Sequence, residues 1–221
     1  TKLNFRISSC AEAFHPEQEN HMVYFTSDLH LGHPGIIKIK QRPFSSVQEM
    51  NEFLIKNYNS VVRKTDKVYL LGDLCHYLPV EQASRMIAQL NGRKILIRGN
   101  HDKKYEPQLF EEIHDFATAS FQGTCFVMMH YPMLAWPKER KGSIQLHGHL
   151  HESREYNLLN REHGILRYDV GVDANQFYPV SVNQIVHFFF GDKESVGEPS
   201  PDKQKGRKKL TPGKPPGIRQ V

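Results

Sequence analysis

Five short loops that carry Asp, Asn and His side chains constrain this chain more than any other feature of its sequence. Each loop directly follows a short apolar run, and in chain order they read DLH, GD, GNHD, a lone His and GHLH. Apolar runs of this length bounded by turn residues are typical of buried β-strands. Because sites in α/β sheets form at the carboxyl ends of strands, we expect the five loops to gather at one edge of a sheet. The side chains offered there are Asp28, His30, Asp73, Asn100, His130, His149 and His151.

The first half of the chain alternates predicted strands and helices. The periodicity of apolar residues predicts, in order, a strand from Met22, a helix at 47–62, a strand at 67–71, a helix at 79–90, a strand at 94–97 and a helix at 105–113. Such alternation is typical of α/β folds.

The second half is richer in predicted strands. Short apolar runs predict strands at 117–121, 124–129, 143–147, 154–158 and 166–170, and the run at 182–190 fits either a helix or a strand. Alternating units followed by a β-rich half predict an α/β fold with two packed mixed sheets and helices outside.

The two ends of the chain differ in composition from its centre. Residues 1–21 are polar and aperiodic, and residues 191–221 are rich in Gly, Pro and Lys. That last stretch has eight basic and four acidic residues, so it holds +4 of the formal net charge of +5. We expect an N-terminal extension at 1–21, one domain at 22–190 and a disordered basic tail at 191–221. The tail could bind nucleic acid through counterion release, but a solvated extension is the favoured interpretation.

Composition also bears on location. No apolar run approaches the roughly 18 residues that a membrane span requires, and no apolar leader precedes Met22. The three cysteines, Cys10, Cys75 and Cys125, are widely spaced and form no CxxC pair. We therefore expect a cytoplasmic protein without a membrane partner.

The ligand types in the five loops indicate first-row metal ions. Two Asp, one Asn and four His offer oxygen and nitrogen donors without a thiolate, which suits manganese, iron or zinc better than calcium. Seven side chains are too many for one ion, and they suit two ions that share a bridging carboxylate. Gly72, Gly99 and Gly148 beside these ligands allow tight backbone turns.

Taken together and in this order, the motifs resemble the calcineurin-like metallophosphoesterase superfamily over residues 22 to about 190. The segments FTSDLHLGHPGIIK and YDVGVDAN are similar to small bacterial and phage members described as predicted phosphoesterases. The resemblance implies a four-layer αββα sandwich and hydrolysis of phosphoric esters with two divalent metal ions. Manganese is the expected metal, with iron, zinc, nickel and cobalt as alternatives.

The resemblance also implies a role for each motif residue. The first ion would be held by Asp28, His30, Asp73 and His151. Asp73 would bridge to a second ion, which would be completed by Asn100, His130 and His149. His101 would stabilise or protonate the leaving oxygen, with Asp102 as its hydrogen-bonding orienter. The nucleophile would be a metal-bound hydroxide.

Two departures from known subfamilies narrow the class. The GD motif continues with Leu74 and Cys75 rather than Asp-Arg-Gly, and the next motif is GNHD rather than GNHE, which argues against a protein Ser/Thr phosphatase. Purple acid phosphatases carry an iron-binding Tyr three residues after the bridging Asp. His76 occupies that position here, which argues against an iron–tyrosinate site.

Substrate contacts are predicted less sharply. His33 could touch the phosphate or cap a helix near Pro34, and Arg98 could face the phosphate unless side-chain alternation turns it away. Trp136 could stack on a base, although a Trp between prolines is more often a packed loop anchor. We expect a phosphodiesterase or phosphatase for a small or nucleotide-like substrate. The alternatives are a nuclease for DNA or RNA and a catalytically silent metal-binding scaffold.

Overall fold

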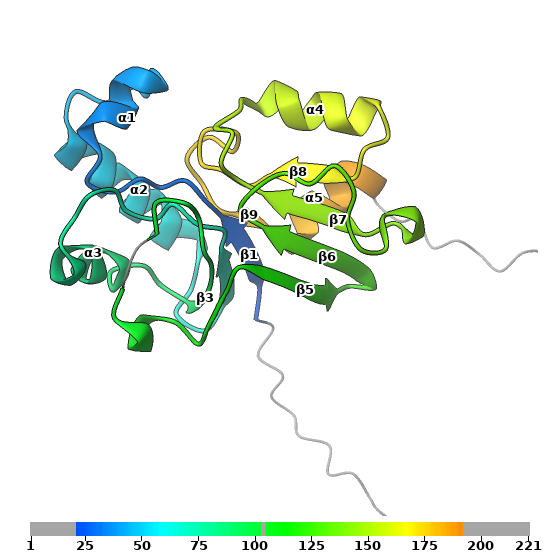
Figure 1. Ribbon diagram of the computed structural model, residues 1–221, viewed down its shortest axis with the longest axis horizontal. Coiled ribbons are helices and arrows are strands. Elements are labelled where there is room, and N and C mark those ends of the chain that lie inside the picture. The colour runs from blue at the N-terminus through cyan, green and yellow to red at the C-terminus, as the bar shows by residue number, and fades with distance from the viewer. Residues whose placement is uncertain (1–20, 103–104, 192–221) are drawn as a thin grey trace, which may run out of the picture. The chain divides into compact units, whose positions relative to one another are not determined.

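The first of two β-sheets has five strands in the order β4-β3-β2-β1-β9 (Figure 1). A computed structural model describes residues 21–102 and 105–191 of the chain. Strands β1 (Val23–Thr26), β2 (Lys67–Leu70), β3 (Arg93–Ile97) and β4 (Glu112–His114) run parallel, and β9 (Val180–Ser181) is antiparallel to β1. The carboxyl ends of β1, β2 and β3 therefore meet at one edge.

The second sheet has four strands in the order β5-β6-β7-β8. They are β5 (Phe116–Phe121), β6 (Thr124–Met129), β7 (Ile144–His147) and β8 (Arg167–Asp169). A two-residue hairpin turn with positive φ at Gln122 (51°) and Gly123 (72°) joins β5 to β6, as the twist of antiparallel strands favours. Strands β6, β7 and β8 are parallel, so this sheet is also mixed.

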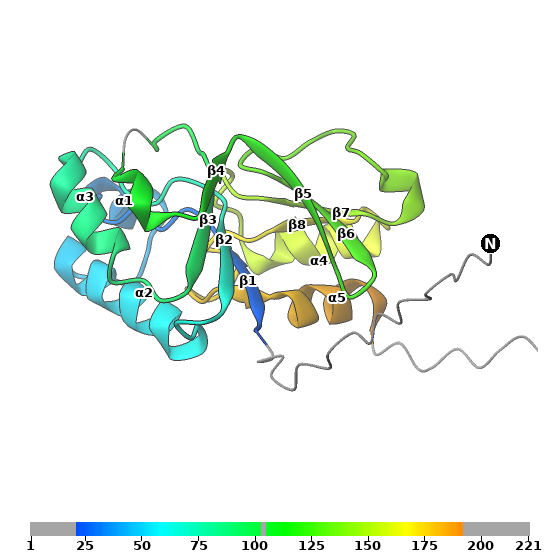
Figure 2. The same ribbon diagram turned by 90° about the horizontal axis from the view of Figure 1, so that it is seen from below.

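Helices cover the outer face of the first sheet, as Figure 2 shows. They are α1 (Pro34–Ile39), α2 (Val47–Val61) and α3 (Val80–Ile87). Ser46 caps α2 by accepting a hydrogen bond from the Glu49 amide at 3.1 Å. Met50, Leu54 and Tyr58 lie on the inner side of α2 and pack in one apolar core with the sheet.

A second apolar core lies between the two sheets. It contains Phe25 and Ile97 of the first sheet and Phe126 and Leu146 of the second, all with at most 1% of their surface exposed. Helix α4 (Arg154–Glu162) packs along β8, and α5 (Val182–Phe190) contacts β1 and β9. Two short 3₁₀ turns, η1 (Pro107–Leu109) and η2 (Glu139–Lys141), lie in loops. The predicted α/β fold, with two packed mixed sheets flanked by helices, is confirmed.

Two predicted elements are wrong. The segment 105–113 is η1 followed by strand β4, because the backbone becomes extended at Phe110 after a single turn and the chain continues as the edge strand beside β3. The segment 154–158 belongs to helix α4 rather than to a strand. The buried side of α4 is polar, with Asn157 and Asn160 facing inward, so an apolar helical stripe was absent from the sequence.

The undecided segment 182–190 is helix α5, and a capping box explains its start. The Ser181 hydroxyl accepts a hydrogen bond from the Gln184 amide at 3.3 Å, and Gln184 Oε1 accepts one from the Ser181 amide at 2.7 Å. The predicted extension and tail fall outside the described residues, apart from residues 21 and 191.

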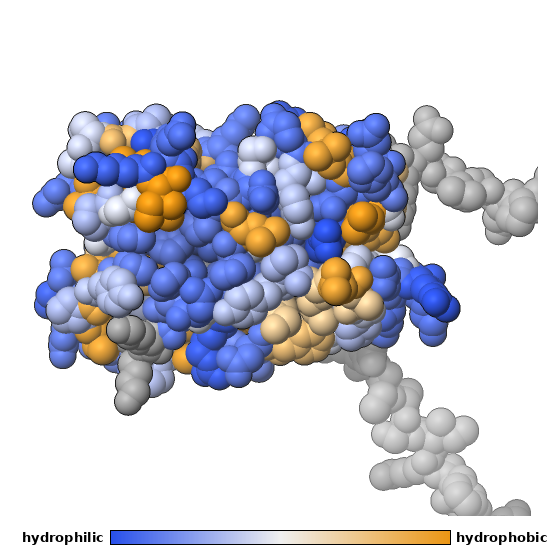
Figure 3. Space-filling view, turned by 45° about the horizontal axis from the view of Figure 1, so that its top comes forward, coloured by the Kyte–Doolittle hydropathy of each residue, from blue (hydrophilic) through white to orange (hydrophobic). Residues whose placement is uncertain are grey.

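Exposed apolar side chains are scattered over the surface. The face drawn in Figure 3 is mostly hydrophilic, with apolar side chains in a few small patches. The most exposed large apolar residues, Leu134, Tyr77 and Ile39, come from three separate segments. Helix α2 is the longest helix of the described part at 15 residues, and none of these helices has the length and apolar character of a membrane span.

Candidate metal centre

The five predicted loops meet where the two sheets adjoin. The loop after β1 is fastened to the loop after β2, because the Asp28 amide donates to the Gly72 carbonyl and the His30 amide to the Asp73 carbonyl, both at 3.0 Å. The loop after β7 approaches the same place, and the His149 amide donates to Asp28 Oδ2 at 3.0 Å. Ligands from both sheets therefore surround one volume.

Five of the seven predicted ligands adopt a left-handed backbone conformation. The φ angles are 58°, 49°, 54°, 70° and 53° for Asp28, His30, Asp73, His149 and His151 respectively. Non-glycine residues rarely adopt this conformation, which costs free energy and persists only where the surroundings enforce it. This clustering of strained residues marks the loops as a functional site.

A first group of ligand atoms comprises Asp28, His30 and His151, whose ligand atoms all lie within 4.8 Å of one another. His151 Nε2 lies 3.1 Å from His30 Nε2 and 3.6 Å from Asp28 Oδ1. His151 Nδ1 faces Asp173 Oδ2 at 2.8 Å, which leaves Nε2 directed to the group.

A second group comprises Asp73, His130 and His149. His130 Nδ1 donates to the Leu71 carbonyl at 2.7 Å, so its Nε2 faces Asp73 Oδ2, 3.4 Å away. Asn100 Oδ1 lies 3.1 Å from His130 Nε2 and 3.0 Å from His149 Nδ1, and so it joins this group.

Asp73 lies between the two groups. Its Oδ2 atom is 3.7 Å from His30 Nε2 of the first group and 3.4 Å from His130 Nε2 of the second. Two glycines make room for the carboxylates: a Cβ at Gly99 would overlap Asp73 Oδ1, and one at Gly148 would overlap Asp28 Oδ2. The site therefore requires glycine at both positions.

Charge in this volume favours a bound cation. Burial raises the pKa of Asp28. Burial also opposes ionisation of Asp73, but contacts with His130 and other donors outweigh it and hold the pKa of Asp73 at about 2. Burial lowers the pKa of His30 to about 2, so this ring is neutral and its Nε2 can donate a lone pair. Buried carboxylates and neutral imidazoles form a donor set that fits divalent first-row ions.

The comparison with protein families agrees with this geometry. A model of the Calcineurin-like phosphoesterase family matches residues 21–153. The chain belongs to the calcineurin-like phosphoesterase family. Metal-dependent hydrolysis of phosphoesters is the general activity of this family, and the predicted resemblance is confirmed.

Proteins similar to this chain include an uncharacterized protein of Methanocaldococcus jannaschii, which is 38% identical over 167 residues, covering 74% of this chain and 89% of the relative. The Gene 66 protein of Mycobacterium phage L5 is 29% identical over 182 residues, and the matched region covers 68% of this chain and 86% of the phage protein. A crystal structure of a protein of unknown function from Aquifex aeolicus shares 28% identity with a TM-score of 0.61, covering 75% of this chain and 98% of that one.

The two residues predicted to act in catalysis have different surroundings: the His101 ring is partly exposed beside Asp73, whereas Asp102 is bonded to backbone amides. His101 Nε2 is 3.9 Å from Asp73 Oδ2, and 36% of the side chain is exposed. The Asp102 carboxylate accepts hydrogen bonds from the amides of Asp73, Leu74 and Gly99 and from the Tyr105 hydroxyl. Asp102 was predicted to orient the His101 ring, but these four donors occupy both its oxygens, and in the described part of the chain no hydrogen bond or ion pair joins it to that ring. Asp102 instead joins the loops that follow β2 and β3.

The predicted substrate contacts divide into one residue near the metal groups and two elsewhere. The His33 ring stacks on His76 with 3.7 Å between centroids and lies 5.5 Å from the His30 ring. His33 makes no side-chain cap for α1. Arg98 instead binds Asp115 through Nε and Nη2, each at 2.8 Å, so its guanidinium is engaged at the surface. Trp136 is 7% exposed and donates to the Ser143 carbonyl, so it is a packed loop anchor.

Three further residues near the loops, His147, Cys75 and His76, are buried or nearly so. His147 is fully buried and bonds the Gly148 carbonyl at 2.8 Å, directly behind the GHLH loop. Burial lowers the pKa of His147 to about 4 and raises that of the Cys75 thiol to about 12, so neither is charged at neutral pH. His76 is 9% exposed, and its ring lies 5.7 Å from that of His30, so it borders the first group of ligands.

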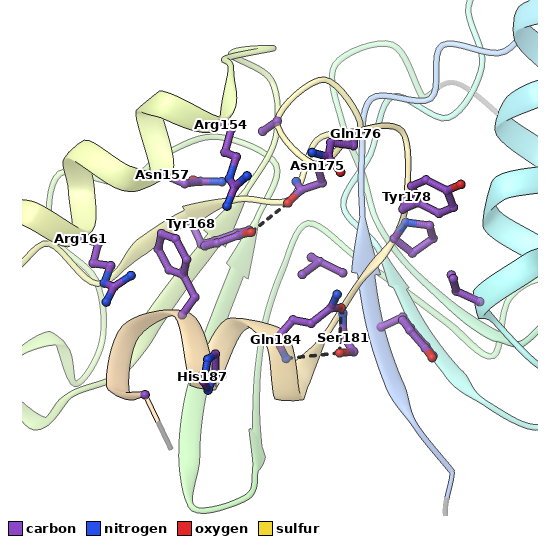
Figure 4. Close-up of a pocket in the computed structure, with 17 residues that line it drawn as sticks. Arg154, Asn157, Arg161, Tyr168, Asn175, Gln176, Tyr178, Ser181, Gln184 and His187 are labelled. Atoms are coloured by element: carbon purple, nitrogen blue, oxygen red, sulfur yellow. Dashed lines mark hydrogen bonds between the residues drawn. The ribbon is translucent and has the colours of Figure 1, made fainter. Parts of the chain in front are cut away.

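A pocket of about 790 Å³ lies apart from the predicted metal ligands, none of which lines it. It is bounded by α4, β8 and α5, and Figure 4 shows Arg154 and Arg161 of α4 among the side chains that line it. Several polar side chains that line the pocket already bond one another. Asn175 Oδ1 accepts a hydrogen bond from the Tyr168 hydroxyl, and Gln184 and Ser181 bond each other. The candidate site is therefore the meeting point of the five loops rather than this pocket.

The sequence analysis missed Arg42 and Asp173. Arg42 is buried and binds Asp173 through two hydrogen bonds of 2.8 Å, and Asp173 in turn binds His151. Burial opposes ionisation of Asp173, but His151 and Arg42 hold its pKa at about 2. The YDVGVDAN segment contains Asp173 and could have drawn attention to it, whereas nothing in the sequence around Arg42 indicates a partner 131 residues away.

Proposed function

We propose that this protein hydrolyses phosphoric esters with two divalent metal ions, manganese being the expected metal, and that its substrate is small or nucleotide-like. The first ion would be held by Asp28, His30, Asp73 and His151, and the second by Asp73, Asn100, His130 and His149. The observation that carries the proposal is the position of Asp73 Oδ2, which lies within 3.7 Å of a ligand nitrogen in each group. A carboxylate so placed can bridge two cations.

Bound ions would supply Lewis-acid stabilisation of the phosphate and activation of water for attack on phosphorus. The protein's own part is to orient the donors and to manage protons. A proton competes with the metal ion for His130 Nε2, because Asp73 and Asp28 raise the pKa of His130 to about 9 against the effect of burial. This proton must leave before His130 can donate a lone pair.

His101 is the proposed general acid. Its backbone amide donates to Asp73 Oδ1 at 2.8 Å, which fixes the residue beside the proposed bridge, while its ring remains partly exposed. A ring that is anchored at the backbone and open to solvent can reach a leaving oxygen on a bound ester. The Asp102 carboxylate contributes indirectly, because it holds the loops of Asp73 and Asn100 together.

Metal content and ester hydrolysis test the proposal together. Chelator-treated protein should lack activity on p-nitrophenyl phosphate and bis(p-nitrophenyl) phosphate, and about two equivalents of Mn²⁺ should restore activity on at least one of them. Protein that binds two ions but hydrolyses neither these esters nor mononucleotides would indicate a silent scaffold. Activity that persists without metal would overturn the proposal.

The nuclease alternative depended on Trp136 and the basic tail. Trp136 is buried in its own loop, and the tail lies outside the described residues. No observation in residues 21–102 and 105–191 therefore favours a polynucleotide over a small ester. Oligonucleotides belong in the substrate screen as competitors of mononucleotides.

A further inference from the structure

We infer that Arg42 and Asp173 are positioning residues that hold the His151 ring and the Asp28 loop in the geometry required by the first metal ion. The inference rests on the proposed metal centre. It assigns these two residues a specific effect on one of the two ions, which separates it from a general role in folding.

Asp173 determines which nitrogen of His151 is available. Asp173 Oδ2 accepts a hydrogen bond from His151 Nδ1 at 2.8 Å, so the ring proton is placed on Nδ1. The lone pair is then on Nε2, which points to Asp28 Oδ1 and His30 Nε2. A carboxylate behind a metal-binding histidine fixes both the tautomer and the orientation of the ring.

Arg42 determines where Asp173 lies. Its Nε and Nη2 atoms bind the two oxygens of Asp173, each at 2.8 Å, in the bidentate arrangement that only a guanidinium offers. The Arg42 side chain is fully buried and that of Asp173 is 12% exposed. Two hydrogen bonds to a fully buried guanidinium therefore fix the position of the Asp173 carboxylate.

The same guanidinium also holds the first ligand loop. Nη2 donates to the Asp28 carbonyl at 2.8 Å, and Nη1 donates to the Leu29 carbonyl at 3.1 Å. These carbonyls belong to the segment in which Asp28 and His30 adopt positive φ. Arg42 therefore supports a strained turn and, through Asp173, a ligand that lies 121 residues later than His30.

Two members of the first group are thus connected to one guanidinium: Asp28 through its carbonyl, and His151 through Asp173. Among the described residues, no hydrogen bond or ion pair joins the second group to Arg42 or Asp173. His130 is held by the Leu71 carbonyl instead, and His149 lies beside Asn100. Loss of the pair should therefore weaken one ion selectively.

Mn²⁺ titration of metal-free protein, followed by calorimetry and by the electron paramagnetic resonance signal of free Mn²⁺, tests this inference. In Asp173→Asn, one of two binding steps should weaken by about 10- to 100-fold, as is typical when a group behind a metal ligand is removed. The other step should change by less than about twofold. Arg42→Lys keeps the charge but not the fork, and it should weaken the same step.

Asp115→Asn is the matched control. Asp115 also binds an arginine, Arg98, with two hydrogen bonds of 2.8 Å, but that pair is at the surface. Its loss should leave both binding steps unchanged. Since Asp173→Asn leaves Arg42 buried without its partner and could fail to fold, the double variant Arg42→Met/Asp173→Asn removes both charges. The double variant should fold and weaken the same step.

Equal weakening of both steps, or unchanged affinity for both, would overturn the inference. So would selective loss of one ion in the Asp115→Asn control. Wild-type protein that binds two ions but hydrolyses no ester would contradict the proposed function. The selective effect of Asp173→Asn on one ion would still test the inference in that case. Wild-type protein that binds no ion would contradict both.

Discussion

At the scale of single residues, the effect of a substitution on metal content should depend on whether the side chain faces one group of ligands or both. Asp73 illustrates this, because one of its oxygens faces a histidine from each group. His149 differs, since its ring contacts Asn100 and His130 of the second group. Substitutions of these residues should therefore have different effects on metal content.

Asp73→Asn should lower the content of both ions, because one amide cannot replace a carboxylate shared by two cations. His149→Ala should lower the content of one ion. Metal analysis of purified protein by plasma mass spectrometry distinguishes these outcomes. A variant Asp73→Asn that retains two ions and full activity would remove the bridging role.

His101→Gln should keep both ions, because the anchoring contact of His101 is made by its backbone amide. If the ring protonates the leaving oxygen, the rate on a nucleoside ester should fall by about 10²- to 10⁴-fold. The loss should be smaller for a nitrophenyl ester, whose leaving oxygen needs little protonation. Equal losses on both esters would favour charge stabilisation instead, and loss of an ion would make His101 a ligand.

At the scale of elements, the strand-end loops were predictable and the links between them were not. Short apolar runs followed by Asp or His identified the ends of β1, β2, β3, β6 and β7, because a buried parallel strand requires such a run. Helix α4 was missed because Asn157 replaces an apolar side chain on its inner face. Asn157 binds both the amide and the carbonyl of Asp169, at 2.7 and 3.0 Å.

The role of Asp102 could not be read from the sequence for a related reason. Its neighbour His101 suggested a side-chain pair, but adjacent residues on a tight loop diverge, and the carboxylate turns to backbone amides of the neighbouring strand's loop. Arg42 and Asp173 likewise form a pair that no local pattern signals. Short motifs thus indicate which residues are candidate metal ligands. The contacts that hold those ligands in place depend on the tertiary fold and cannot be predicted from local sequence.

Asp102→Asn should destabilise the fold and not only slow catalysis. The carboxylate accepts four hydrogen bonds, and an asparagine would turn an NH₂ group toward two of the donors. Hydrogen bonds to a charged group contribute about 1.5–3 kcal/mol each, so a loss of at least about 2 kcal/mol in the free energy of unfolding is expected. Urea denaturation measures it, with Asp115→Asn as the surface control. Unchanged stability would show that Asp102 does not join the loops.

At the scale of the whole molecule, a buried acid behind the site should make stability depend on pH. Asp169 is fully buried, and burial, together with the charge of Asp28, raises its pKa to about 8 from an ordinary value of 3.8. Between these values the unfolded chain releases a proton that the folded chain retains. The free energy of unfolding should therefore fall as pH rises from about 4 to 8, by at most about 1.4 kcal/mol per pH unit.

Asp169→Asn removes this titration and leaves the other groups in place. Relative to wild type, the metal-free variant should gain stability progressively between pH 5 and pH 8, as measured by urea denaturation in the presence of chelator. A constant difference between the two proteins over that range would show that Asp169 is already ionised in the folded state.

Each proposed metal group combines ligands that lie far apart along the chain. Asp28 and Asp73 follow strands of the first sheet, whereas His130, His149 and His151 follow strands of the second. During synthesis the ribosome releases the carboxylates and Asn100 long before the histidines of the GHLH loop. The second set of donors is complete only when residue 149 has emerged, and the first only when residue 151 has. Both also require the second sheet to have docked, so we expect metal loading to come late in the maturation of the newly made protein.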